Sequence, residues 1–480
     1  KDRRTLVLLL VTDLRDHELV LGKLCSSLLL VLVLIGTSAP VFFLIQLLGG
    51  ISWQQIVWML GLCVAVALAA GSWGTLVAFW REKTFQTLAI SVLGVVAYLG
   101  LVEAALVIWG QSVWLTALNP FRALLLTHDP FSSTGTSVIQ ASVTVMTLIG
   151  VALSILTIVC LRLWNPSRAN FVQPETTSEE TGGRQQVRHR RIWNNPVIWR
   201  EIRTRAYGHK VLAIKAAYVA LAGYCVYSLV EFAAATNLIL GMISPAGFAF
   251  VGLALLSLML INAQAVTALT SERDGKTLEL LLATDLTARE FIFGKLGGIV
   301  YNTRELILIP LGLMAWQATL GAVSWEQFVF ILLGFGMLTL FAAMLGLHSG
   351  LSFENSRTAI INSLGTLFFL FIGIFIFLML LVEASGSFAS QLLSFIVFIG
   401  LGGIGLWASL THKNPSNALT LAAGWLPFVT FYCITEFLQN GSLSVCLSIL
   451  AVYGFTTLAM LIPAISAFDV ALGRTTVDKG

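Results

Sequence analysis

The sequence predicts an all-α polytopic membrane protein made of two tandem six-helix-type bundles, the first of them incomplete. Three observations lead to this fold class. Hydrophobic residues make up 57% of the 480 residues and charged residues only 11%. Uncharged stretches such as residues 24–80 and 130–161 are longer than a membrane-spanning helix requires. Finally, one segment of the chain occurs twice, which indicates a duplicated module.

The repeat joins residues 2–24 to residues 274–296 at a constant offset of 272, with 13 of 23 positions identical. The same register continues beyond the motif without a gap. Ser52 and Trp53 match Ser324 and Trp325, and Gly74 matches Gly346. Self-similarity at a fixed offset over this length predicts two copies of one module in a single polypeptide.

Positive charges predict the topology. All but three of the 28 Lys and Arg residues fall in a few segments, which the positive-inside bias assigns to the cytoplasm. These segments are residues 1–23, 81–83, 162–215 and 272–295, Arg357, and the tail after Phe468. The exceptions are Arg122, Arg304 and Lys413.

The first repeat covers residues 1–164, and its apolar runs predict spans near 24–48, 55–79, 85–109 and 137–161. Compared with the second copy, it lacks an entry segment and two spans. The repeat therefore leads us to expect about 80 further residues upstream of Lys1. Residues 165–194, rich in Pro, Ser, Thr and Glu and then in Arg, are expected to form a cytoplasmic linker.

The second repeat covers residues 195–474 and opens with a basic amphipathic segment at 195–210. Spans are predicted near 212–231, 247–271, 296–318, 327–350, 359–382 and 443–465. Two further apolar stretches, 391–410 and 419–438, could be two added spans or a re-entrant pair at the outer face. Charge counting does not choose between these options, because both leave the tail in the cytoplasm.

No catalytic or metal-binding pattern is found in the sequence. The six Cys stand singly, and no His-Glu-x-x-His motif occurs. Gly275, Lys276 and Thr277 resemble the end of a phosphate-binding loop, but Thr270 replaces its first Gly and an apolar run precedes it. We therefore expect no ATPase activity, bound cofactor, metal or nucleic-acid partner for this chain.

The repeated segment after the 247–271 span is the strongest candidate for function. Residues 277–283 read as a short amphipathic helix, and Thr287 with Glu290 has the spacing of a capping box. A single such helix would be expected to lie on the headgroups. Its duplication favours the alternative, a surface that docks on a partner.

Two motifs of this chain resemble those of the type-2 export permeases of ABC transporters. The stretch 271–286 followed by Gly294-Lys295 is similar to their signature after the second span. The stretch 195–201, Asn-Pro-Val-Ile-Trp-Arg-Glu, is similar to their opening before the first span. The resemblance covers residue 195 to the end, and residues 1 to about 161.

This resemblance implies a permease subunit of an ATP-driven ABC exporter in the plasma (inner) membrane of a bacterium, with ATP and Mg on separate ATPase subunits. The segment after the second span would be a coupling helix that docks on those subunits. Its implied docking residues are Glu272, Thr277, Leu278, Glu279, Leu280 and Leu281 in the second copy, and Thr5, Leu6, Leu8 and Leu9 in the first. The family's Pro is replaced by Asp13 and Asp285, and Glu279 corresponds to Val7, so unequal docking surfaces are expected.

Charges within the predicted spans are the best indication of a transport path. Arg304 and Glu305 would lie near mid-bilayer on a continuous helix from Phe291, where a charge is costly. They either line a path or satisfy one another and a neighbouring span. For Glu103, a neutral form or pairing with a neighbouring helix is the simpler explanation. An ion-coupled secondary transporter and a membrane scaffold or enzyme are the alternative functions, and the substrate stays open.

Overall fold

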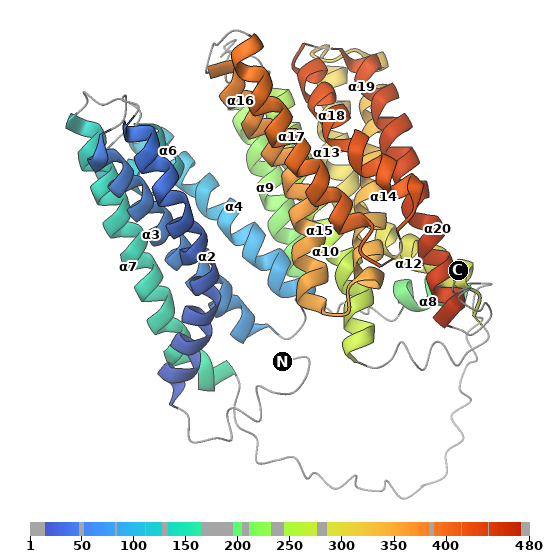
Figure 1. The fold of residues 1–480 in the computed structure, drawn as a ribbon, viewed down its shortest axis with the longest axis horizontal. Coiled ribbons are helices and arrows are strands. Elements are labelled where there is room, and N and C mark those ends of the chain that lie inside the picture. Colours follow the sequence, from blue (N-terminus) through green and yellow to red (C-terminus); the bar gives the residue numbers. More distant parts are fainter. Residues whose placement is uncertain are drawn as a thin grey trace, which may run out of the picture. The chain divides into compact units, whose positions relative to one another are not determined.

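The computed structural model describes most of the chain as helices, in two units. The units are Lys1–Val187 and Arg188–Gly480. Every described element is a helix, and ten of the helical stretches are long and apolar enough to cross a membrane (Figure 1). The described residues are 15–47, 52–81, 84–110, 112–126, 133–164, 195–203, 211–231, 244–275, 286–383, 388–413, 415–439 and 441–471.

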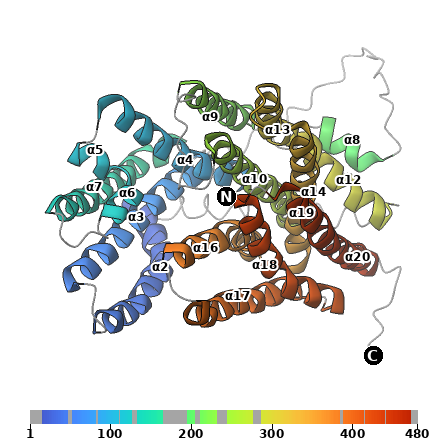
Figure 2. The same ribbon diagram turned by 90° about the horizontal axis from the view of Figure 1, so that it is seen from above.

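The described residues of the first unit form four long helices and two short ones. They are α2 (Asp16–Leu47), α3 (Trp53–Trp80), α4 (Thr84–Trp109), α5 (Val113–Ala117), α6 (Pro120–Leu126) and α7 (Ser133–Trp164). Helix α3 packs along α7, and α2 packs on α3 (Figure 2). Small residues allow the closest approach: a Cβ at Gly150 would lie 2.9 Å from Leu68 Cγ.

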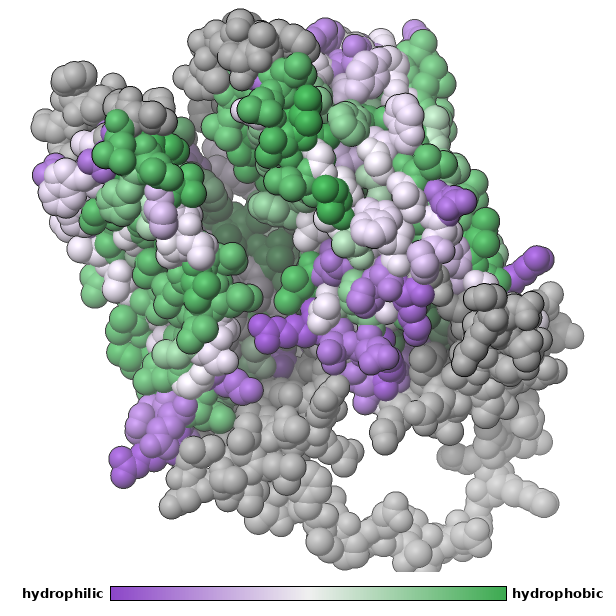
Figure 3. All heavy atoms as spheres, viewed as in Figure 1, coloured by the Kyte–Doolittle hydropathy of each residue, from purple (hydrophilic) through white to green (hydrophobic). Residues whose placement is uncertain are grey.

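The second unit begins with a short helix and continues with long ones. Its elements are α8 (Pro196–Arg203), α9 (Val211–Glu231), α10 (Pro245–Asp274), α12 (Ala288–Asn302), α13 (Arg304–Thr319), α14 (Trp325–Ser352), α15 (Ser356–Leu367), the π-helical η1 (Phe368–Gly373), α16 (Ile374–Glu383), α17 (Phe388–Leu410), α18 (Asn417–Leu438), α19 (Ser442–Ser448), η2 (Ile449–Tyr453) and α20 (Gly454–Ala471). Hydrophobic side chains cover much of the visible helix surface (Figure 3). This distribution is the one expected of helices that face lipid.

Helices α10 and α14 form the buried centre of the second unit. A Cβ at Gly346 of α14 would lie 2.6 Å from Ala265 Cβ and 2.8 Å from the Asn262 carbonyl oxygen. The buried Asn262 side chain donates to Ala342 O at 2.9 Å and accepts from Ser363 Oγ at 2.8 Å. Close backbones and hydrogen bonds between helices are the interactions that hold helices together where lipid replaces water.

The helix boundaries keep the offset of the sequence repeat. Helices α3 and α14 both begin and end 272 residues apart, and Ser52 with Gln55 and Ser324 with Gln327 form equivalent capping boxes. Helix α2 starts and ends at positions equivalent to the start of α12 and the end of α13. The repeat therefore extends from residue identity to helix length and capping.

The stretch 296–318, predicted as a span, is helical but is interrupted at Thr303. This residue adopts φ −104° and ψ 12°, which interrupts the helix between α12 and α13. Its hydroxyl donates to Ile299 O at 2.8 Å. The equivalent position in the first unit, Val31, lies inside the continuous helix α2.

Stretches 391–410 and 419–438, for which two arrangements were open, lie in α17 and α18. Each helix is long and apolar enough to span a membrane, and the two pack against one another. The turn between them lies near the α14–α15 turn, because the His412 ring stacks on Phe353 at a centroid distance of 4.5 Å. The α14–α15 turn is on the predicted cytoplasmic side, which favours two added spans.

Candidate functional site

Most of the residues expected to dock on a partner lie outside the described residues. These are Thr5, Leu6, Leu8, Leu9, Thr277, Leu278, Glu279, Leu280 and Leu281. Glu272 is described and lies in the last turn of α10, directly before the 276–285 segment. The structure therefore describes the base from which this segment leaves the helices.

Four charged side chains from three helices meet at this base. Lys295 Nζ of α12 donates to Glu201 Oε1 at 2.6 Å and to Glu272 Oε1 at 2.7 Å. Arg200 of α8 binds Glu272 and lies 3.2 Å from Glu201 Oε1. We call Arg200, Glu201, Glu272 and Lys295 the ion cluster.

The ion cluster is compact and electrically balanced. Its two cations match its two carboxylates, and the side chains of Lys295 and Glu201 are only 1% and 4% exposed. Opposite charges at such distances compensate the cost of taking each one out of water. Loss of one partner would leave a buried charge without compensation, so the cluster holds α8, α10 and α12 in one arrangement.

Helix α8 reaches the cluster because of its opening motif. Asn195 Oδ1 accepts from the backbone N–H groups of Val197 and Ile198 at 3.0 and 3.1 Å, while its Nδ2 donates to Glu290 O at 2.9 Å. Pro196 occupies the first helical position, where its missing N–H costs nothing. The asparagine thus starts α8 and attaches it to α12 at the same point.

Two glycines of α12 let α8 lie directly on it. A Cβ at Gly294 would lie 2.7 Å from Val197 Cβ, and one at Gly298 would lie 2.6 Å from Glu201 Cβ. The spacing of four residues puts both glycines on one face of α12. A larger residue at either position would push Glu201 away from Lys295.

The two residues after Glu272 attach α10 to a second pair of helices. Arg273 Nη1 donates to the carbonyl oxygens of Gly350 and Phe353, at the end of α14. A cation is favourable at a helix C-terminus, where carbonyl groups lack partners. Asp274 accepts from Ser356 Oγ at the start of α15. We call Glu272, Arg273 and Asp274 the α10 anchor.

Local hydrogen bonds also fix the start of α12, which follows the 276–285 segment in the chain. The predicted capping box at the start of α12 is confirmed: Glu290 N donates to Thr287 Oγ1 at 3.2 Å, and Thr287 N donates to Glu290 Oε2 at 3.0 Å. The 276–285 segment therefore connects the α10 anchor to a capped helix.

Arg304 and Glu305 lie at the start of α13, next to the helix break, and not inside a continuous helix as expected. Glu305 Oε2 accepts from Lys215 Nζ of α9 at 2.7 Å, and Arg304 Nε lies 3.4 Å from Glu305 Oε1. The Arg304 guanidinium lies 4.8 Å from the centre of the Tyr301 ring. Sequence reasoning missed Lys215 as a partner because it counted this lysine only among the cytoplasmic basic residues.

Glu103 of the first unit pairs with a neighbouring helix, which confirms the simpler of the expectations for it. Arg122 of α6 donates to both carboxylate oxygens, at 2.8 and 2.6 Å, and Asn119 Nδ2 donates to Oε1 at 2.5 Å. The carboxylate, by accepting these bonds, holds the pKa of the Arg122 guanidinium above its ordinary value. The contacts orient α6 against α4.

The fold and this site define a multi-pass helical membrane protein in which helices α8, α10 and α12 converge on an ion cluster. Sequence reasoning missed three residues of the ion cluster. They lie in the two motifs, but the sequence predicted no role for them: Arg200, Glu201 and Lys295. The signal that could have found them is the pairing of two basic and two acidic residues among these motifs. No family model, curated protein or solved structure matches this chain.

Proposed function

We propose that this chain is the transmembrane permease subunit of an ATP-driven ABC exporter, coupled to separate ATPase subunits through the 276–285 segment. The observation that carries the proposal is that both motifs, which lie on three helices, converge on the ion cluster. Residues from α8, the end of α10 and α12, which are far apart in the sequence, contact one another at the base of this segment.

The contacts suggest how a displacement of the 276–285 segment would reach the spans. Through Glu272 it would move α8 and α12, and through Arg273 and Asp274 it would move the junction of α14 and α15. Charged, partly buried contacts transmit such a displacement because breaking any one of them is costly. The ATPase subunits would bind ATP and Mg²⁺, and this chain would supply the docking surface and the path.

In this proposal each copy contributes one bundle and one docking surface, within a bacterial plasma membrane. The copies differ at the docking surface, since Val7 stands where the second copy has Glu279. Glu272 is 15% exposed and bound to Lys295 and Arg200. Its role in the proposal is to position the 276–285 segment, while residues 277–281 supply the contact with the ATPase.

An ion-coupled secondary transporter is the second candidate, because internal repeats also occur in that class. The Lys215–Glu305 pair is the observation that favours it. Such transporters are expected to carry ionisable residues at matching places in both repeats. The positions equivalent to Arg304 and Glu305 are Leu32 and Val33, so this reading is the weaker one.

Co-purification tests the permease proposal. We expect an ATPase subunit to co-purify in mild detergent with the full-length wild-type protein, and to be lost on Glu279→Arg, because the reversed charge would face the partner. Glu326→Arg is the matched control, since Glu326 is an exposed carboxylate at the start of α14, on the opposite predicted side. An ATPase absent from the wild-type preparation, or retained equally by both variants, would contradict the proposal.

A further inference from the structure

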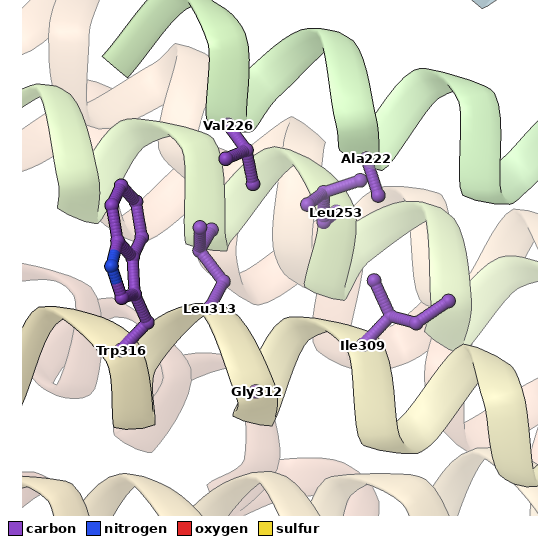
Figure 4. A pocket seen from close by; sticks show the side chains of 7 residues that line it. All are labelled: Ala222, Val226, Leu253, Ile309, Gly312, Leu313 and Trp316. Carbon is purple, nitrogen blue, oxygen red and sulfur yellow. The ribbon is translucent and has the colours of Figure 1, made fainter. Parts of the chain in front are cut away.

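An apolar groove lies between α9, α10 and α13, outside the ion cluster. Its volume is about 310 Å³, and its lining side chains point toward one another across the space between the helices (Figure 4). Ala222 and Val226 form the α9 wall, and Leu253 of α10 forms the floor. The α13 wall consists of Ile309, Gly312, Leu313 and Trp316.

Charged residues lie on α9 and α13 one to two turns before the groove. Lys215 precedes Ala222 by seven residues and Glu305 precedes Ile309 by four, spacings that keep each pair on one helix face. The 2.7 Å bond between Lys215 and Glu305 joins the two walls at this end. Arg304 adds a second cation there, and its side chain is 53% exposed. The three side chains carry a net charge of +1.

Length and position of the groove match one leaflet of a bilayer. From Glu305 to Trp316 the α13 wall rises about 16 Å, close to half of the hydrocarbon core of about 30 Å. The charged end lies near the start of α9, which follows the basic segment assigned to the cytoplasm. Anionic lipids concentrate at the cytoplasmic surface, and basic pockets between spans on that side bind their headgroups.

We propose that this groove binds an anionic phospholipid of the cytoplasmic leaflet, with one acyl chain along α9 and α13 and its phosphate at Arg304 and Lys215. The lining is apolar apart from the indole N–H of Trp316, so it suits an acyl chain better than a free anion or a sugar. The net positive charge at one end selects an anionic headgroup over a neutral one. This inference does not depend on the proposed permease function.

Thermal unfolding of the full-length protein in detergent tests the site. Phosphatidylglycerol and phosphatidylcholine with identical acyl chains are added, and the midpoint is followed by tryptophan fluorescence. We expect phosphatidylglycerol to raise the wild-type midpoint at lower concentration than phosphatidylcholine does. Arg304→Gln should reduce this preference about fivefold, the effect of one cation near a headgroup.

Filling the groove tests the acyl-chain position. A Cβ at Gly312 meets open space, so the side chain of Gly312→Leu should enter the groove and abolish the stabilisation by both lipids. Val226→Trp fills the groove from the opposite wall and should have the same effect. Gly223→Leu is the matched control, because a Cβ at Gly223 also meets open space and this residue does not line the groove.

Two results would overturn the inference. Equal stabilisation of the wild type by both lipids would remove the headgroup assignment, and wild-type stabilisation of Gly312→Leu and Val226→Trp would remove the groove as the site. Because no ATPase subunit takes part in this assay, its outcome is separate from that of the co-purification experiment.

Discussion

At the scale of single residues, equivalent positions of the two copies have different environments. Lys295 is 1% exposed and bound by two carboxylates, whereas Lys23, its equivalent at the offset of 272, is exposed on α2. The lysine is therefore identical in the two copies, but only Lys295 forms buried ion pairs. A buried ammonium group is stable only with such partners, so the environment of Lys295 depends on Glu201 and Glu272.

Replacement of Lys295 measures the contribution of the ion cluster. Lys295→Met should lower the free energy of unfolding by about 3–5 kcal/mol, because the buried Glu201 and the partly buried Glu272 would then share Arg200 alone. Lys23→Met, the same change at an exposed position, should alter it by less than about 0.5 kcal/mol. Denaturant unfolding in detergent measures both, and equal effects of the two changes would contradict a stabilising role for the cluster.

At the scale of elements, the repeat predicts helix length and capping better than helix continuity. Helices α3 and α14 agree in both boundaries, since local signals such as the Ser-x-x-Gln capping box determine them. The break at Thr303 was not predicted, because one continuous helix was expected through the polar residues 302–305. The repeat also did not predict the close packing around Gly346. Gly74 is the equivalent residue of the first copy, yet a Cβ at Gly74 meets nothing within 4 Å.

Glycine substitutions in α14 test this packing. Gly346→Ala should destabilise the protein by about 1–3 kcal/mol, because its Cβ would meet Ala265 Cβ and the α10 backbone. Gly336 lies in the same helix, and a Cβ there meets open space. Gly336→Ala should therefore stabilise the protein by about 0.5–1 kcal/mol, because Ala has the higher helix propensity. Thermal unfolding of the two variants checks the sign, and a destabilisation shared by both would argue against a specific contact.

At the scale of the whole molecule, the structure accounts for all three exceptions to the charge rule. Arg122 is bound by Glu103, and Arg304 lies beside Lys215 and Glu305 near the predicted cytoplasmic end of α9. Lys413 lies in the turn between α17 and α18, next to His412, whose ring stacks on Phe353 of the α14–α15 turn. If α17 and α18 both span, this turn faces the cytoplasm with the other basic segments.

Cysteine labelling tests this topology. In a chain whose six native cysteines are replaced, Lys413→Cys should react with a membrane-impermeant maleimide only after the cells are permeabilised. Ser178→Cys in the linker should behave the same way, and Ala322→Cys in the α13–α14 turn should react in intact cells. Labelling of Lys413→Cys from outside would instead indicate a re-entrant pair at the outer face.

The sequence by itself determined the all-α membrane class, the duplication, most helix positions and the capping boxes, because hydropathy and capping depend on neighbours within a few turns. It also located the motifs that carry the candidate site. Only the tertiary structure decided that Arg200, Glu201, Glu272 and Lys295 meet, that α12 and α13 are separate helices, and that Lys215 partners Glu305. These features arise from contacts between residues up to about a hundred positions apart, whose pairing depends on how the helices pack and not on the local pattern.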